Sequence, residues 1–191
     1  MSTTTTNTTN PMVKLIGLLT IIAAVVMIVA GGVTWGFVTS QLKAENISVA
    51  PITEEEPGAL AGKPVAGPFT AYAQAVAINH HALAGADNRT YAELGDDAKV
   101  LKAQLAADGM DEAEVAKDSG VIALAAQRTS TMNGSFLRAS LFTSVVSYGI
   151  AALVIGLGVL FALLGFALRS MSTTTVVTAA PAPAAPVTTR A

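Results

Sequence analysis

Two long runs without a charged residue dominate the pattern of hydrophobic and polar positions. One extends from Leu15 to Leu42 and the other from Ala139 to Leu168. A helix rises about 1.5 Å per residue and the hydrocarbon core of a bilayer is about 30 Å thick, so about 20 apolar residues suffice to cross it. Backbone groups in lipid must satisfy one another, which makes both runs helical. The pattern predicts transmembrane helices over residues 13–40 and 132–169, the second including a helical entry segment.

The first run has an alternative interpretation as a cleaved signal peptide, with Lys14 in its n-region and a small-residue cleavage site at 30–32. Signal h-regions span about 7–15 residues. This run instead stays apolar through Trp35 and Phe37, which favours an uncleaved anchor. A buried core helix is the alternative for the second run, but nothing else in the chain is large enough to bury it.

The segment between the runs, residues 41–131, has a helical pattern after a proline-rich stretch that ends at Pro68. Large apolar residues then recur on one helical face up to a stop at Gly85: Phe69, Tyr72, Val76 and Leu83. Thr90 and Glu93 have the spacing of a capping box, which predicts the start of a second helix. That helix is predicted to run to Ala107 and to turn Val100, Leu101 and Leu105 inward.

A third helical stretch is predicted from Asp111, with an interruption at Gly120, and from about Ser130 the helix should continue into the second span. Large apolar residues are few in this middle segment and alternate with alanine. A core built from them would be thin, and domains of this size are marginally stable. We therefore expect the domain to lean on the membrane surface, on a second copy or on a partner.

The two tails, residues 1–12 and 170–191, are rich in threonine, asparagine, alanine and proline. They are too poor in large apolar side chains to form a core, and the composition predicts disorder.

Composition agrees with a membrane protein. Of the 191 residues, 52% are hydrophobic and 13% are charged, against roughly 25% charged in soluble domains. The formal net charge of −2 provides no basic field to attract nucleic acid, and the absence of cysteine excludes disulfides and thiolate chemistry. The predicted fold is an all-α membrane protein in which two transmembrane helices flank a small helical extramembrane domain.

Charge beside the spans bears on orientation. Lys14 has no acidic neighbour, whereas Lys43 is close to Glu45. Loops longer than about 60 residues translocate largely regardless of their charge, and the first helix usually dominates. The sequence therefore favours cytoplasmic termini and a domain outside the cytoplasmic membrane.

Catalytic chemistry leaves little trace in the sequence. The only histidines, His80 and His81, are adjacent, so on a helix they point about 100° apart and do not converge on one metal ion. Surface or interface roles are favoured over ligation. The uncharged runs Leu15–Leu42 and Ala139–Leu168 contain no Asp, Glu, Lys, Arg or His, which disfavours a pump or coupled transporter. We predict no catalytic, cofactor-binding or metal-binding residue.

The spans do carry small residues at spacings that allow close helix packing. The candidate packing positions are Gly32, Gly36, Gly149, Gly156, Gly158 and Gly165. The alternative is that these spacings arise by chance in a chain rich in glycine and alanine. The contact could join the two spans of one chain or two copies.

A hydroxyl stripe begins beside Arg138, where the second helix enters the membrane. Its members recur at helical spacings of three and four: Ser140, Thr143, Ser144 and Ser147. One interpretation is that each hydroxyl bonds back to its own helix. The other is that the stripe docks against the first span near Thr34 or Thr39, or against a partner.

Three stretches resemble a family of two-span membrane proteins of high-GC actinobacteria. They are residues 67–75, residues 90–94 and, the most specific, Met132–Val146. The resemblance covers about Leu15 to Leu168, and it implies a two-span topology and an actinobacterial host. Members are often labelled as aromatic ring-opening dioxygenases, which would imply iron held by two histidines and a carboxylate. This chain departs from the family in a longer Asp96–Arg128 segment.

Taken together, these patterns favour a non-enzymatic accessory or interaction protein that presents a small helical domain outside the membrane. Its expected partners are the lipid bilayer and either a second copy or another membrane protein, with no nucleic acid and no cofactor. The alternatives are an enzyme or enzyme subunit, as the family label implies, and a channel-like oligomer.

Overall fold

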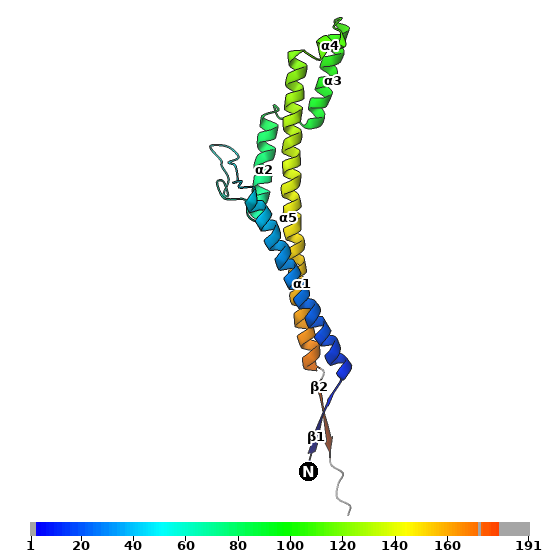
Figure 1. Ribbon diagram of the computed structural model, residues 1–191. Helices are drawn as coiled ribbons and strands as arrows, with labels where there is room; N and C mark the ends of the chain where they lie inside the picture. The colour runs from blue at the N-terminus through cyan, green and yellow to red at the C-terminus, as the bar shows by residue number, and fades with distance from the viewer. Residues whose placement is uncertain (1–2, 172, 180–191) are drawn as a thin grey trace, which may run out of the picture. The chain divides into compact units, whose positions relative to one another are not determined.

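Five helices and one short ribbon make up the computed structural model (Figure 1), which describes residues 3–171 and 173–179. The elements in chain order are β1 (Thr3–Thr9), α1 (Pro11–Ala44), α2 (Pro68–Ala84), α3 (Tyr91–Ala107), α4 (Glu112–Val115), α5 (Ser119–Met171) and β2 (Thr173–Ala179). Apart from the ribbon the described fold is all-α, and two of its helices are long and apolar enough to cross a membrane. The predicted all-α class is confirmed.

The chain divides into two compact units, and both long helices contribute to each. The first unit contains Pro11–Gly32 of α1 and Leu153–Met171 of α5, which we call the helix pair, together with the ribbon. The second unit is residues 33–152, which we call the central domain.

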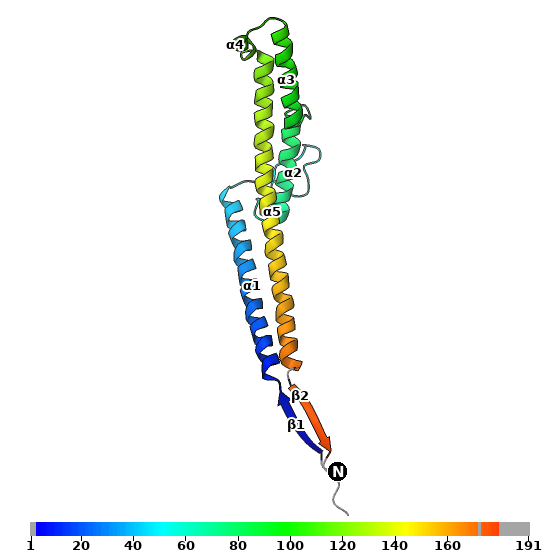
Figure 2. The same ribbon diagram turned by 90° about the vertical axis from the view of Figure 1, so that its right-hand side faces the viewer.

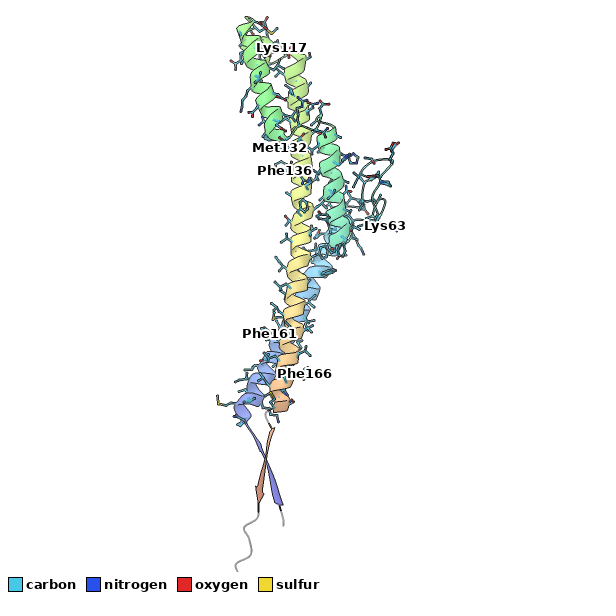
Figure 3. The ribbon with its side chains drawn as sticks, turned by 180° about the vertical axis from the view of Figure 1, so that it is seen from behind. Lys63, Lys117, Met132, Phe136, Phe161 and Phe166 are labelled. Carbon is cyan, nitrogen blue, oxygen red and sulfur yellow. The ribbon has the colours of Figure 1, made fainter. Side chains whose placement is uncertain are left out.

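Most side chains of the helix pair are exposed. Within the most apolar 18-residue windows, 11% of α1 and 17% of α5 is buried. Large exposed residues occur on both helices, and they include Ile22, Val26 and Leu160. Phe161 and Phe166 of α5 are also exposed (Figure 3). The core helix of a soluble protein would instead be mostly buried.

The central domain has a small core in which Tyr148 is its largest buried side chain. The other buried members come from α1, α2, α5 and the segment between the first two helices: Leu42, Val49, Val65, Ala71, Ala75 and Leu141. The segment after α1 is held by a bridge between Ser48 and Pro64, and Val49 N–H donates to the Lys63 carbonyl at 2.9 Å. These contacts lie in the proline-rich stretch that precedes the helical pattern.

α2 packs through alanines rather than through its large residues. Figures 1 and 2 both show it running beside α5, and Gly134 of α5 lies against Ala82. Ala71 and Ala75 are fully buried, whereas Phe69 and Tyr72 are exposed. Of the large residues picked out by the sequence pattern, Phe69, Tyr72 and Val76 are therefore exposed and Leu83 is half-buried. Alanines occupy the face that packs against α5 because their small side chains let the two helices approach closely.

α3 begins as the sequence predicts. The Thr90 hydroxyl accepts from Glu93 N–H, and the Glu93 carboxylate accepts from Thr90 N–H at 2.7 Å, which completes the capping box. Of the residues predicted to turn inward, Leu101 and Leu105 are half-buried, and Leu101 lies against Gly120 of α5. Val100 is exposed, which corrects the prediction at that position, and Leu94 is fully buried. Leu94 and Gly95 lie on the side of α3 that faces Arg128 of α5.

α5 is a single helix of 53 residues that starts well before the predicted entry segment. Its start is marked by Asp118, whose carboxylate accepts from the N–H groups of Gly120 and Val121 at 2.9 and 3.1 Å. Gly120 thus lies in the first turn and does not interrupt a helix, which corrects the prediction. The break falls instead between α4 and Asp118.

Each of the two tails contributes one strand to the ribbon. β1 and β2 pair antiparallel, with Thr3 opposite Ala179 and Thr9 opposite Thr173. Threonine and valine have high strand propensity, which favours such a ribbon once the ends of two helices bring the segments together. Residues 1–2, 172 and 180–191 of the predicted tails lie outside the described residues.

Candidate functional site

Two of the candidate glycines form a close contact between the two long helices. A Cβ added at Gly158 would lie 2.7 Å from Ile28 Cγ1 and 3.0 Å from the Ala24 carbonyl oxygen. At Gly165 the corresponding distances are 2.7 Å to Ile21 Cγ1 and 2.8 Å to the Gly17 carbonyl oxygen. Real Cβ atoms essentially never approach so closely, so glycine is required at both positions.

The contact is reciprocal, because Gly17 of α1 faces α5 in the same way. An added Cβ there would lie 2.9 Å from the Gly165 carbonyl oxygen. Sequence reasoning missed Gly17, which has no glycine or alanine four residues away in α1. The role of Gly17 can be recognised only from the packing of the two helices, because Gly17 lies opposite Gly165 only when α1 and α5 are antiparallel.

The other four candidates have open space at the Cβ position: Gly32, Gly36, Gly149 and Gly156. The structure thus brings Gly158 and Gly165 into a helix contact and leaves the Gly-x-x-x-Gly of α1 outside it. Spacing alone did not separate the two groups.

The hydroxyl stripe bonds mainly to its own helix. Thr143 donates to the Ala139 carbonyl at 2.8 Å, Ser147 to the Thr143 carbonyl at 2.8 Å, and Ser144 to the Ser140 carbonyl at 3.3 Å. These are the local bonds that serine and threonine make inside helices. The Ser140 side chain is exposed.

In place of the hydroxyl stripe, Tyr148 of α5 makes the contact with α1. Its hydroxyl lies 2.7 Å from the Thr39 hydroxyl, and its ring meets Trp35 edge-to-face with 4.7 Å between ring centroids. The Tyr148 hydroxyl also lies 3.5 Å from the Ala66 carbonyl. Thr39 was a predicted docking position, but Tyr148 was missed. The available signal was a lone phenol in an apolar run, since a buried tyrosine hydroxyl needs a partner.

Arg138 lines a cavity of about 340 Å³ that also includes Asn79, Thr131 and Ser135. Its guanidinium carbon lies 5.8 Å from the centre of the Phe142 ring. Its Nε is buried and has no hydrogen-bond partner among the described residues. At least one N–H donor of the Arg138 guanidinium therefore has no hydrogen-bond acceptor within the described part of the domain.

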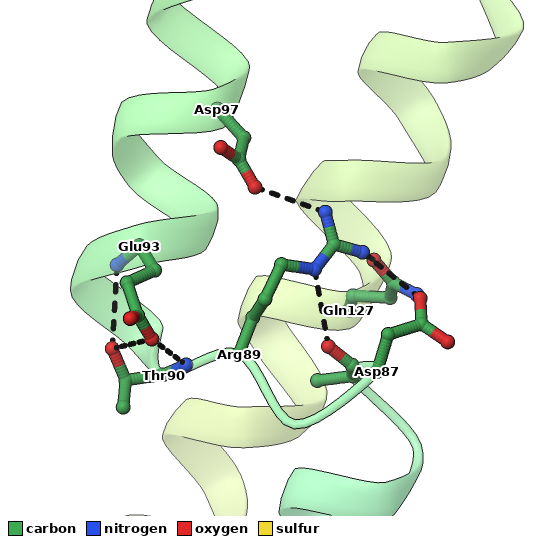
Figure 4. Close-up of polar contacts among 7 residues, drawn as sticks. Asp87, Arg89, Thr90, Glu93, Asp97 and Gln127 are labelled. Atoms are coloured by element: carbon green, nitrogen blue, oxygen red, sulfur yellow. Dashed lines mark hydrogen bonds and ion pairs between the residues drawn. The ribbon is translucent and has the colours of Figure 1, made fainter.

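The turn between α2 and α3 holds an ionic cluster centred on Arg89 (Figure 4). Arg89 donates to Asp97 at 2.9 Å, to Asp87 at 3.0 Å and to the Gln127 amide oxygen at 3.0 Å. The hydrogen bond to Asp97 is the main reason that the pKa of Arg89 is raised above its usual value. The cluster ties the turn to α5, and its ions are satisfied by one another, so it has the character of a structural tie.

Beside this cluster, two carboxylates are held in their charged form. Hydrogen bonds from the backbone N–H and then the hydroxyl of Thr90 lower the pKa of Glu93. A hydrogen bond from Lys99 lowers the pKa of Asp96. Neither carboxyl has the raised pKa typical of a general acid.

The histidine pair is arranged edge-to-face, with 5.7 Å between ring centroids. His81 Nε2 lies 2.8 Å from the Pro51 carbonyl oxygen, which engages one of its two nitrogens. Among residues 3–171 and 173–179, no group of three or more histidine, aspartate or glutamate side chains is placed to hold a metal ion.

Comparisons of the chain with protein-family models, with curated proteins and with solved structures give no match. Function is therefore inferred from the geometry of the chain itself.

Proposed function

We propose that this chain is a two-span integral protein of the cytoplasmic membrane that holds the central domain outside the cell as a non-enzymatic accessory or interaction module. The observation that supports the proposal best is the exposure of large apolar side chains around the helix pair, of which only 11% and 17% of the most apolar windows is buried. Lipid is the surrounding that satisfies such a surface without cost.

The contact through Gly158 and Gly165 supports α1 as a retained anchor rather than a cleaved signal. Both glycines lie against the α1 backbone, so removal of α1 would expose a surface shaped for another helix. In lipid, close packing of small residues is a main source of helix association. A signal sequence that is discarded needs no such fit.

The proposed orientation places both termini in the cytoplasm. It is supported by Lys14, which has no acidic neighbour, and by the usual dominance of the first helix. The actinobacterial host is proposed on the family resemblance alone.

Alkaline carbonate extraction of membranes, followed by iron analysis of the purified protein, tests this proposal. We expect the chain to remain in the membrane pellet and to purify without stoichiometric iron. Release into the supernatant would contradict the two-span proposal. Stoichiometric iron with catechol-dependent oxygen uptake that is lost in His81→Ala would contradict the non-enzymatic role and favour the activity in the family label.

A further inference from the structure

The outward face of α2 is apolar and carries no charge. Phe69 is 80% exposed, Tyr72 53% and Val76 36%. No aspartate, glutamate, lysine or arginine occurs anywhere in α2. We call these three side chains the α2 apolar face. Exposed apolar side chains that gather on one face of a helix, as here, mark a surface for interaction.

The position of this face follows from the contacts between α2 and α5. Tyr72 meets Phe142 edge-to-face at 5.9 Å, while Ala82 lies against Gly134 farther toward the start of α5. The two helices are therefore antiparallel, and the first turn of α2 lies nearer to Phe142 than to Gly134 along α5. The Ala66 carbonyl, just before α2, lies 3.5 Å from the hydroxyl of Tyr148, which follows Phe142 in α5.

A polarity gradient runs along this edge of the central domain. Phe69 comes first, then the Tyr72–Phe142 pair, and then Arg138 one turn farther along α5. A bilayer has the same order, from acyl chains through an interface that favours aromatic rings to the charged phosphates. A face on a soluble protein partner has no reason to follow that order.

We propose that the α2 apolar face rests in the bilayer interface, with Phe69 and Tyr72 below the headgroups and Arg138 beside a lipid phosphate. The guanidinium of Arg138, which lines a cavity together with Asn79 and Ser135, supplies the cationic end of the site. This inference rests on the proposed two-span function, because the bilayer is its partner. It makes the membrane surface a structural component of the central domain.

Nitroxide accessibility tests the apolar end. The chain has no cysteine, so Phe69→Cys can be spin-labelled in the full chain after reconstitution in vesicles of phosphatidylcholine and phosphatidylglycerol. Val100→Cys, on the exposed part of α3, is the water control, and Leu160→Cys, exposed on the helix pair, is the lipid control. We expect the Phe69 label to collide readily with oxygen and to lose most of the collisions with a water-soluble nickel complex seen at Val100.

The three labels separate failure of this inference from failure of the proposed function. Nickel access at Phe69 equal to that at Val100, with Leu160 protected, would overturn the inference alone. Nickel access at Leu160 as well would contradict the two-span proposal. Protection of Phe69 accompanied by dipolar broadening between labels would show that a second copy covers the face and would also overturn the inference.

The cationic end is tested by thermal unfolding in the same vesicles. We expect the melting temperature to rise when phosphatidylglycerol replaces part of the phosphatidylcholine, and this rise to be lost in Arg138→Gln. Arg128→Gln is the matched control, because Arg128 also has a buried, unpartnered Nε but stacks on Tyr91 at 4.1 Å. Equal loss in both variants, or the same rise with inorganic phosphate in detergent, would overturn the lipid assignment.

Discussion

The helix pair and the central domain use the same two helices but join them by different chemistry. In the helix pair, Gly158 and Gly165 bring the backbones together by having no side chain. In the central domain, Tyr148 fills the space between the helices and bonds to Thr39. Where the surroundings are apolar, association relies on close packing. Where a loop and α2 cover the helices, a large aromatic residue with a hydroxyl can be buried and satisfied.

The largest effect should come from Tyr148, on which the central-domain contact depends. Tyr148→Ala should destabilise the protein by about 3–5 kcal/mol, the range for replacing a buried large aromatic residue by alanine. Tyr148→Phe should cost about 1 kcal/mol, because it leaves the Thr39 hydroxyl without its partner. Chemical unfolding in mild detergent, followed by the fluorescence of Trp35, measures both. Phe136→Ala, at an exposed position on the same helix, is the control; an equal loss there would show that Tyr148 has no special role.

The next effect tests the helix pair. Gly165→Leu should destabilise the pair by about 1–3 kcal/mol, because the added side chain overfills a contact in which even a Cβ lies 2.8 Å from a carbonyl oxygen. Gly156→Leu is a matched control with open space, and it should leave stability unchanged. Thermal unfolding of both variants in lipid gives the comparison. Equal losses would mean that the two helices do not meet at Gly165.

A smaller effect is expected at the α3 capping box. Thr90→Ala should cost about 1 kcal/mol, because it removes the hydroxyl that accepts from Glu93 N–H. Thr129→Ala, which removes only a hydroxyl bonded to the carbonyl four residues earlier, should be neutral or slightly stabilising. Amide hydrogen exchange at the start of α3 reports the change directly. Unchanged protection in Thr90→Ala would contradict a stabilising cap.

The smallest effect is the acid dependence of the same cap. The pKa of Glu93 in the folded chain is below its usual 4.5. The hydrogen bonds between Thr90 and the charged Glu93 therefore stabilise the folded state above about pH 4.5. This stabilisation is lost as the pH falls through the folded-state pKa of Glu93. Stability of α3 measured from pH 7 to pH 3 should fall less steeply in Glu93→Gln than in the native sequence. Identical slopes would show that Glu93 is not held in its charged form by Thr90.

Local patterns predicted the elements well. The uncharged runs predicted α1 and the end of α5, and the Thr90–Glu93 spacing predicted the start of α3. These features depend on neighbours along the chain. The start of α5 after Asp118 was not predicted, because Gly120 suggested a break in the helix there.

The contacts between elements were harder to predict. The pairing of Gly17 with Gly165 depends on the register of two helices far apart in sequence. Burial of Tyr148 depends on Thr39 and Ala66, which no local spacing relates to it. The orientation of α2 was also not predicted. This helix has one face of alanines and one of large apolar residues, and the alanine face packs against α5 because it allows the helices to approach more closely.

Cysteine labelling in intact cells tests the central claim of two spans most directly. The probes are Val100→Cys on α3, Met12→Cys at the start of α1 and Met171→Cys at the end of α5, all at exposed positions. We predict that a membrane-impermeant thiol reagent labels Val100→Cys in intact cells, and labels the other two only after permeabilisation. Met12→Cys and Met171→Cys on opposite sides, or all three positions on one side, would contradict the two-span account.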